Sequence, residues 1–303
     1  MRRRTRKNSK RIYLGGSKNR DERCIFISLM NGAEAEGLGN QLFNYAAGLT
    51  IQDKINLPIC ILDGKGNPHS DRDYRKILDA NPVNQTSDIL TRINSAQNVL
   101  PGKRSFTNSW NTSNIKNSGT KNIKIPSTLY QNYNSVKHII PKFKQILLKK
   151  EFYKDVYAPY KKDIKSKETA FMHVRRGDKV LRGHTMDSNY YINGLKELDK
   201  NPIIKTIYIF SNDKAWCDAH MDEWTKSVTK TLEYKDIPDE LVTLYVMILC
   251  EAGAILSSST FGAWGAMLGA DMNAKSTIVY IKRPAEYFMR TNPIEFPSRW
   301  IGM

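Results

Sequence analysis

The feature that most constrains the fold is a regular alternation of apolar strand-like and amphipathic helix-like segments in the second half of the chain. From about residue 168, the strand-like segments are TAFMHV, TIYIF, VTKTLEY, GAILSS and STIVYI. Helices are predicted between them, near 187–198, 214–224, 238–252 and 260–270. Alternation of this kind is typical of a parallel sheet covered by helices.

A second unit of the same kind begins the chain. The run CIFISLM (24–30) predicts a buried strand, NGAEAEGLG a glycine-rich turn, and NQLFNYAAGLTIQDKI a helix. The segment LPICILD (57–63) predicts the next strand, which completes a βαβ unit. Residues 64–128 show no strong periodicity and are expected to be irregular or weakly helical, whereas HIIPKFKQILLKKEFY is again helical.

We therefore predict an α/β protein of two lobes that divide near residue 160. The predicted parts are a basic disordered tail at 1–20, an N-terminal lobe at 21–160 and a C-terminal lobe at 161–303. The tail contains nine Lys and Arg residues and no acidic residue, a composition that cannot bury a core. A solvated leader is the preferred interpretation, and an arm for nucleic acid or an anionic surface is the alternative.

Membrane and redox signals point to a cytoplasmic protein. The tail lacks the apolar core of a signal peptide. No later stretch reaches the ~18 uncharged apolar residues of a transmembrane helix. The four cysteines, Cys24, Cys60, Cys217 and Cys250, are spaced too widely for a metal cluster or a disulfide framework. We therefore expect reduced, buried thiols, as in cytosolic proteins.

Polar residues gather where the predicted strands end. Ligands of open parallel sheets bind beyond the carboxyl ends of the strands, so this shared position indicates a site. The candidates in the first lobe are Gly37, Gly39, Asn40 and Gln41. The candidates in the second lobe are His173, Arg175, Arg176, Asp178, Ser211, Asn212, Asp213, Ser258, Ser259 and Thr260.

Arg175 and Arg176 suit a diphosphate, because guanidinium groups bind phosphate oxygens bidentately and stay charged. Adjacent residues of an extended segment point to opposite sides, so we expect one arginine to face the ligand and the other to brace the loop. The alternative is an ion pair with Asp178 that closes the turn. His173 either holds a backbone group or contacts the ligand.

Two helix starts complete the candidate site. In SSSTFGAWGAML, Ser259 or Thr260 is expected to cap a helix whose free N–H groups could meet a phosphate, capping alone being the alternative. In EGLGNQLF, only two glycines are present, so this turn is not a nucleotide-wrapping GxGxxG motif. The amides of Asn40 and Gln41 both donate and accept, which suits sugar hydroxyls.

Other chemistries have weaker support in the sequence. Asp71 and Asp73 have the DxD spacing of metal-dependent sugar transferases, but they do not follow a predicted strand. The histidines show no paired ligand spacing, so we expect no metal. There is no GxSxG motif of a serine hydrolase. The net charge of +17 raises nucleic-acid binding as an alternative, but interleaved aromatic residues and known binding motifs are missing.

Taken in order, these motifs resemble the α1,2-fucosyltransferase family (glycosyltransferase family 11). The similar segments are GLGNQLFNYAAG, LYQNYNSVKHI, HVRRGD, YYINGL, FSNDKAW and STFGAWGAML, over roughly residues 25–283. The resemblance implies two Rossmann-like lobes in a GT-B-like architecture and GDP-fucose as the donor. It also implies no metal or other cofactor, inversion at the anomeric carbon and a galactose-terminated glycan as acceptor. The alternatives are another GDP-deoxysugar or a protein acceptor.

The resemblance also implies roles for individual residues. His173, Arg175 and Asp178 match the HxRRxD motif, with Arg175 or Arg176 on the diphosphate. Ser259 and Thr260 match phosphate contacts, Asn40 a contact to the donor sugar and diphosphate, and Asn212 and Asp213 a guanine site. Asp178 is the first candidate for the base that deprotonates the acceptor hydroxyl, and Glu36 is the second. The chain departs from the family pattern at Ser258, Gly262 and Ala263.

Overall fold

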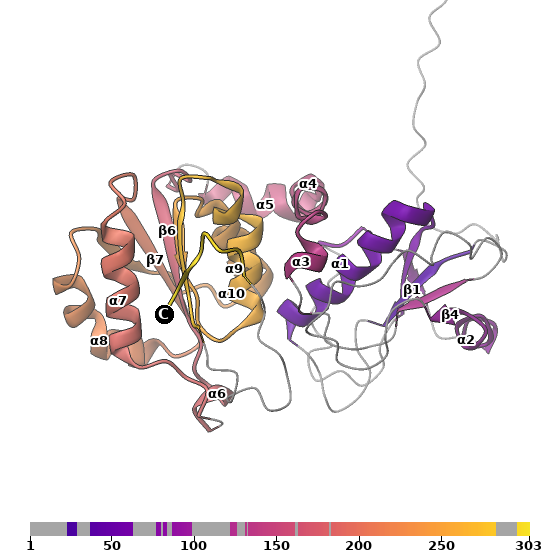
Figure 1. The fold of residues 1–303 in the computed structure, drawn as a ribbon, viewed down its shortest axis with the longest axis horizontal. Helices are drawn as coiled ribbons and strands as arrows, with labels where there is room; N and C mark the ends of the chain where they lie inside the picture. The colour runs from indigo at the N-terminus through magenta and orange to yellow at the C-terminus, as the bar shows by residue number, and fades with distance from the viewer. Residues whose placement is uncertain are drawn as a thin grey trace, which may run out of the picture.

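The computed structural model contains two parallel β-sheets, one in each lobe (Figure 1). The residues that it describes are 23–28, 37–62, 77–79, 81–83, 87–98, 122–125, 131, 133–160, 163–181, 183–282 and 296–303. The predicted tail, Glu36, Asp71 and Asp73 lie outside these residues.

The first sheet has five strands in the order β3-β2-β1-β5-β4, and all neighbours are parallel. Its elements are β1 (Ile25–Ser28), α1 (Leu38–Ile55), β2 (Ile59–Leu62), β3 (Asn81–Val83), α2 (Ser87–Asn94), β4 (Gln97–Asn98) and β5 (Ile123–Ile125). Within 64–128, where the structure describes only 77–79, 81–83, 87–98 and 122–125, α2 agrees with the expectation of an irregular or weakly helical segment, whereas the three short strands β3, β4 and β5 were not predicted. Strands of two or three residues are too short to show a sequence period.

Three helices connect the sheets, namely α3 (Tyr133–Val136), α4 (Ile140–Lys149) and α5 (Glu151–Tyr160). The second sheet has six strands in the order β11-β10-β9-β6-β7-β8, again all parallel. Its strands are β6 (Thr169–Val174), β7 (Thr206–Ser211), β8 (Thr231–Tyr234), β9 (Gly253–Ile255), β10 (Thr277–Tyr280) and β11 (Ile301–Gly302). Its helices are α6 (Asp178–Leu181), α7 (Ser188–Asp199), α8 (Lys214–Lys226), α9 (Glu240–Leu249), α10 (Thr260–Leu268) and the 3₁₀ helix η3 (Ala270–Met272). The α/β prediction is confirmed, and the five predicted strands of this half are β6 to β10.

The strand order of the second sheet places its switch point between β6 and β9. From β6 the chain runs outward to β7 and β8 and then returns to the other side of β6. Every residue of β6 is buried, because helices cover both faces of the sheet. In Figure 1, α7 and α8 lie on one face, while α9 and α10 lie on the face toward α1. Ligands of such sheets bind at the carboxyl ends beside the switch point, here after Val174 and Ile255.

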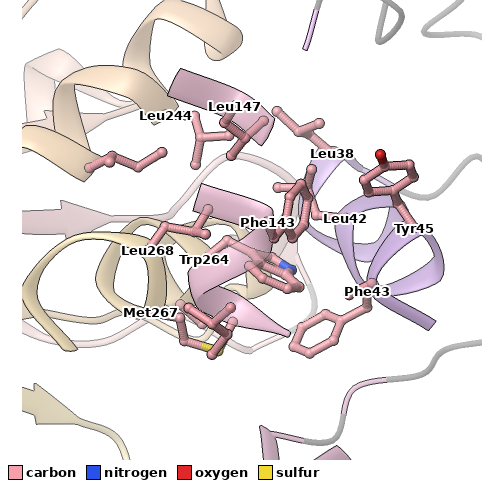
Figure 2. Close-up of a cluster of buried hydrophobic side chains, with 14 of the residues drawn as sticks. Leu38, Leu42, Phe43, Tyr45, Phe143, Leu147, Leu244, Trp264, Met267 and Leu268 are labelled. Atoms are coloured by element: carbon pink, nitrogen blue, oxygen red, sulfur yellow. The ribbon is translucent and has the colours of Figure 1, made fainter. Parts of the chain in front are cut away.

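A single hydrophobic core joins the lobes. It contains residues of β1 and α1 from the first lobe, α4 from the connection, and α9 and α10 from the second lobe. Figure 2 shows Trp264 at the centre of this contact, with Phe43 and Phe143 beside it. The ring centroid of Trp264 lies 4.8 Å from that of Phe43 and 5.3 Å from that of Phe143. The shared core holds the beginnings of α1 and α10 in a defined relation.

The prediction of reduced cysteines was wrong for two of the four. Cys24 and Cys60 form a disulfide, with their Cα atoms 5.8 Å apart, although 36 positions separate them in the sequence. Parallel pairing of β1 with β2 brings the two together, and the spacing along the chain does not encode that pairing. Cys217 and Cys250 are free and buried, as expected. The argument for a cytosolic protein assumed that all four cysteines are reduced, and the disulfide removes that argument.

None of the helices that the structure describes is long and apolar enough to cross a membrane.

Candidate active site

Two helices begin at the same place, one from each lobe. A Cβ atom on Gly39, in the first turn of α1, would lie 2.5 Å from the backbone nitrogen of Phe261 and 2.5 Å from Thr260 Oγ1 in α10. Only glycine permits this approach. The Trp264 indole donates to the Gly39 carbonyl oxygen at 2.9 Å. Neither first turn contains an acidic residue, so two positive helix ends lie side by side.

The predicted cap of α10 is Ser259, whose hydroxyl accepts from the Phe261 N–H at 3.3 Å. Thr260 is therefore left for another contact, and its hydroxyl donates to Asn40 Oδ1 at 3.1 Å. The same oxygen accepts from Gln131 Nε2 at 2.6 Å. Thr260, Asn40 and Gln131 thus meet from three separate segments of the chain.

His173 connects the end of β6 to α10. Its Nδ1 lies 2.8 Å from Ser257 Oγ, and its ring packs beside Phe261 with centroids 5.7 Å apart. A Cβ on Gly262 would lie 2.7 Å from the same Nδ1, so the absence of a side chain there makes room for the imidazole. His173 is 6% exposed. Burial, and then the nearby charge of Arg175, lower the pKa of His173 to about 3, so the ring is neutral near pH 7.

Arg176 braces the loop that follows β6. Its Nε donates to Asp213 Oδ2 at 3.1 Å, and its guanidinium lies over the Trp216 ring, 4.3 Å from the centroid. Its backbone N–H donates to Asn212 Oδ1 at 2.9 Å. The other oxygen of Asp213 caps α8 by accepting from the Trp216 N–H. The β6 loop and the β7 loop therefore form one rigid unit.

Gly177 completes this unit. Its φ of +48° lies in the left-handed region, which disfavours residues with a side chain. A Cβ there would also lie 2.4 Å from Asn212 Nδ2. The glycine of the HVRRGD motif is therefore required by both the backbone conformation and the packing.

Arg175 directly precedes Arg176 in this loop. It is half-buried, and its charge contributes to the lowered pKa of His173. One of its guanidinium nitrogens is 3.9 Å from the position that a Cβ on Gly177 would take. Because His173 packs against the first turn of α10, the charge of Arg175 acts on a residue that touches one of the two helix starts.

The structure thus brings most of the predicted site residues to one edge. Those placed together are Gly39, Asn40, His173, Arg175, Arg176, Asn212, Asp213, Ser259 and Thr260. Gln41 is fully buried in α1 and has no accessible surface for a ligand. Asp178 begins α6, directly after the arginine loop, but the structure does not describe its side chain. Glu36 lies outside the described residues.

Sequence reasoning missed three contributors to the site: Gln131, Ser257 and Trp216. Gln131 lies in the LYQNYNSVKHI segment, so the resemblance could have pointed to it. Ser257 and Trp216 lie in the segments SSSTFGAWGAML and FSNDKAW, but the sequence did not show their contacts, because their partners His173 and Arg176 lie in another strand and loop. Within the described part of the chain, no group of three or more His, Cys, Asp or Glu residues is placed to hold a metal ion.

Comparison with known proteins identifies a family for the second half of the chain. Residues 154–303 match the model of Glycosyl transferase family 11, which confirms the resemblance found in the sequence. The chain is 24% identical over 276 residues to the O-antigen biosynthesis glycosyltransferase WbnK of Escherichia coli. That alignment covers 77% of this chain and 87% of WbnK.

Two solved structures are similar to this chain at low sequence identity. POFUT1 in complex with GDP-fucose is 9% identical with a TM-score of 0.54, and the match covers 87% of this chain and 99% of that one. The fucosyltransferase NodZ from Bradyrhizobium is 12% identical with a TM-score of 0.46, covering 82% and 94%. The likeness to POFUT1 confirms the GT-B-like arrangement of two α/β lobes.

Proposed function

The C-terminal half of this chain is a glycosyl transferase family 11 domain, and from that premise we propose an α1,2-fucosyltransferase. The proposed enzyme moves L-fucose from GDP-fucose to the 2-hydroxyl of a galactoside, with inversion and without a metal or other cofactor. The observation that carries the proposal is the meeting of two helix N-termini, free of acidic residues, beside Arg175. Such a place favours a multiply charged anion like a diphosphate.

Departure of GDP places negative charge on the leaving diphosphate oxygens. Fixed donors stabilise that charge best when they are already in position, because they need not reorganise during the reaction. In the proposal, Arg175 supplies a guanidinium and the first turn of α10 supplies its free N–H groups. The Thr260 hydroxyl donates its proton to Asn40 Oδ1 and so helps to hold that amide. Arg176 does not face the ligand, because its guanidinium is held by Asp213 and Trp216. It keeps the Arg175 loop in place.

The guanine ring is proposed to lie beside Asn212 and Asp213. Asn212 is exposed, so its amide is accessible. Both Asp213 oxygens already accept a hydrogen bond, but each carboxylate oxygen has a second lone pair that the guanine N–H donors could use. The Arg176 contact therefore orients this carboxylate but leaves it able to accept further hydrogen bonds.

The acceptor hydroxyl attacks the anomeric carbon from the face opposite to GDP. The bond from that carbon to the diphosphate oxygen breaks as the bond to the acceptor oxygen forms, and the hydroxyl proton passes to a base. His173 is a poor candidate for this base, because its pKa of about 3 makes it a weak proton acceptor near pH 7. Asp178 remains the first candidate and Glu36 the second. One such step inverts the anomeric centre.

Support for a glycan acceptor comes from the similarity to WbnK, a glycosyltransferase of O-antigen biosynthesis. The 2-hydroxyl of a terminal galactose is the position implied by the sequence motifs. Another GDP-deoxysugar as donor, or a protein as acceptor, is the competing assignment.

The test combines donor binding with the chemistry of the product. We expect GDP and GDP-fucose to raise the melting temperature, and UDP- and CMP-sugars to leave it unchanged. With lactose as acceptor, the product should be cleaved by a fucosidase specific for α1,2 linkages. A shift with UDP-sugars alone would overturn the donor. Transfer of fucose to a peptide, or through another linkage, would overturn the acceptor while keeping the donor.

A further inference from the structure

We infer that Gln131 is a positioning residue that orients the Asn40 amide, so that Asn40 presents its NH₂ group rather than its carbonyl oxygen to the donor diphosphate. The inference rests on the proposed function and adds a residue to the same site. Gln131 precedes α3, in the connection between the lobes, and it is half-buried.

The orientation follows from the chemistry of the two amides. Gln131 Nε2 can only donate a hydrogen bond, and it lies 2.6 Å from Asn40 Oδ1. The Thr260 hydroxyl donates to the same oxygen at 3.1 Å. Turning the Asn40 amide over would place an NH₂ group against the NH₂ of Gln131. The Thr260 hydroxyl could reverse its role, but with the Gln131 amide as the structure places it the contact to Gln131 would be lost, so the two amides fix their orientations together.

The consequence is a defined donor at the site. With Oδ1 held by Gln131 and Thr260, Asn40 Nδ2 points away from both. Within the part of the chain that the structure describes, Nδ2 has no hydrogen-bond partner of its own. Asn40 belongs to the first turn of α1, whose backbone packs on Thr260 and Phe261 at the start of α10. Nδ2 therefore adds two N–H donors where the helix ends already favour an anion.

The same contacts make the donor site depend on the docking of the lobes. Asn40 comes from the first lobe, Thr260 from the second, and Gln131 from the connection between them. The two partners of the Asn40 amide come from outside the first lobe, so the amide takes this orientation only when the lobes and the connection are assembled.

Replacement of Gln131 by glutamate and by methionine separates this role from a structural one. An ionised glutamate accepts but cannot donate, so Gln131→Glu should turn the Asn40 amide and present its carbonyl oxygen to the phosphate. We expect the Kd for GDP, measured by calorimetry at pH 8, to rise about tenfold, on the scale of one hydrogen bond to a charged group. Gln131→Met removes the contact without adding charge and should raise the Kd about threefold.

A double-mutant cycle shows whether Gln131 acts through Asn40. In the Asn40→Ala background, Gln131→Met should no longer change the Kd, because the amide that it orients is missing. Any further loss for Gln131→Glu in that background measures direct repulsion of the phosphate by the new carboxylate.

Gln145→Glu is the matched control, since it makes the same charge change at an exposed position of α4. It should bind GDP like wild type. An unchanged Kd in Gln131→Met, or an equal effect of that variant with and without Asn40, would overturn the inference. If Gln131→Glu does not fold, the Gln131→Met cycle decides alone. If wild type and Gln145→Glu both fail to bind GDP, the proposed function itself is wrong.

Discussion

The indole N–H of Trp264 in the second lobe donates to the carbonyl oxygen of Gly39 in the first lobe, at 2.9 Å. Both groups are buried, and the bond lies directly behind the meeting point of α1 and α10. One aromatic residue thus connects the shared core of the two lobes to the proposed phosphate site.

Replacement of Trp264 tests this connection. Trp264→Ala should lower the free energy of unfolding by about 3–5 kcal/mol, because it leaves a cavity beside Phe43 and Phe143. Trp264→Phe keeps much of the packing but removes the indole N–H that donates to the Gly39 carbonyl, for a loss of about 0.5–1.5 kcal/mol. Urea unfolding measures both. Met272→Ala, at an exposed position, is the control. Equal stability of Trp264→Phe and wild type would contradict a role for the hydrogen bond.

Gly39 and Gly37 form a matched pair. Gly39→Ala would place a methyl group 2.5 Å from backbone and side-chain atoms of α10, so the two helix starts must separate. We expect a loss of about 1–3 kcal/mol in stability and a loss of GDP binding. Gly37→Ala adds a methyl group where no atom lies within 4 Å, at a φ of −63°, and should leave both properties close to wild type. GDP binding by Gly39→Ala at the wild-type Kd would show that the approach of the helices is not needed.

Replacement of the two adjacent arginines should have different effects. Arg175→Ala should lower kcat by at least about 100-fold, because it removes a donor to the developing charge. Arg176→Ala breaks the contacts to Asp213 and Trp216, so it should lower the melting temperature as well as the activity. Steady-state kinetics and thermal unfolding of both variants are the measurements. A near-normal rate for Arg175→Ala would remove Arg175 from the site.

Asp178 is tested by separating binding from transfer. Asp178→Asn keeps the size of the side chain and cannot take a proton, so it should bind GDP normally and lose fucosyl transfer. Loss of GDP binding together with transfer would indicate that Asp178 supports the loop instead.

The buried imidazole of His173 should make the folded state sensitive to acid. Its pKa is about 3 in the folded protein and about 6.5 when exposed in the unfolded chain. The unfolded state therefore binds the extra proton between these values, so His173 stabilises the fold fully above about pH 6.5 and loses that contribution as the pH falls toward 3. Between pH 7 and 4.5, the free energy of unfolding of His173→Gln, measured in urea, should fall less steeply with decreasing pH than that of wild type, by up to about 1.4 kcal/mol per pH unit. If the two proteins lose stability at the same rate per pH unit, His173 is not the cause of the acid sensitivity.

Much of the fold followed from local patterns. The strands β6 to β10 and the helices between them were predictable, because each strand lies within an apolar segment; even the three-residue β9 lies in the run GAILSS. The edge of the sheet that bears the site was predictable as well, since parallel strands bring their carboxyl ends together. The short elements β3, β4 and β5 were not predictable, because they have two or three residues each and lie in the polar segment 64–128.

The sequence alone determined which side chains stand at the strand ends, such as Arg175, Arg176 and Thr260, because the order of residues along each strand and turn is a local property. Only the tertiary structure decided which of them meet. The division of roles between the two arginines depends on Asp213 and Trp216 in another loop. The orientation of Asn40 depends on Gln131 and Thr260, 91 and 220 positions away, and the disulfide joins cysteines 36 positions apart. Contacts of this range arise from the pairing of strands and the docking of lobes, which are set by the summed packing of the core rather than by the residues that finally touch.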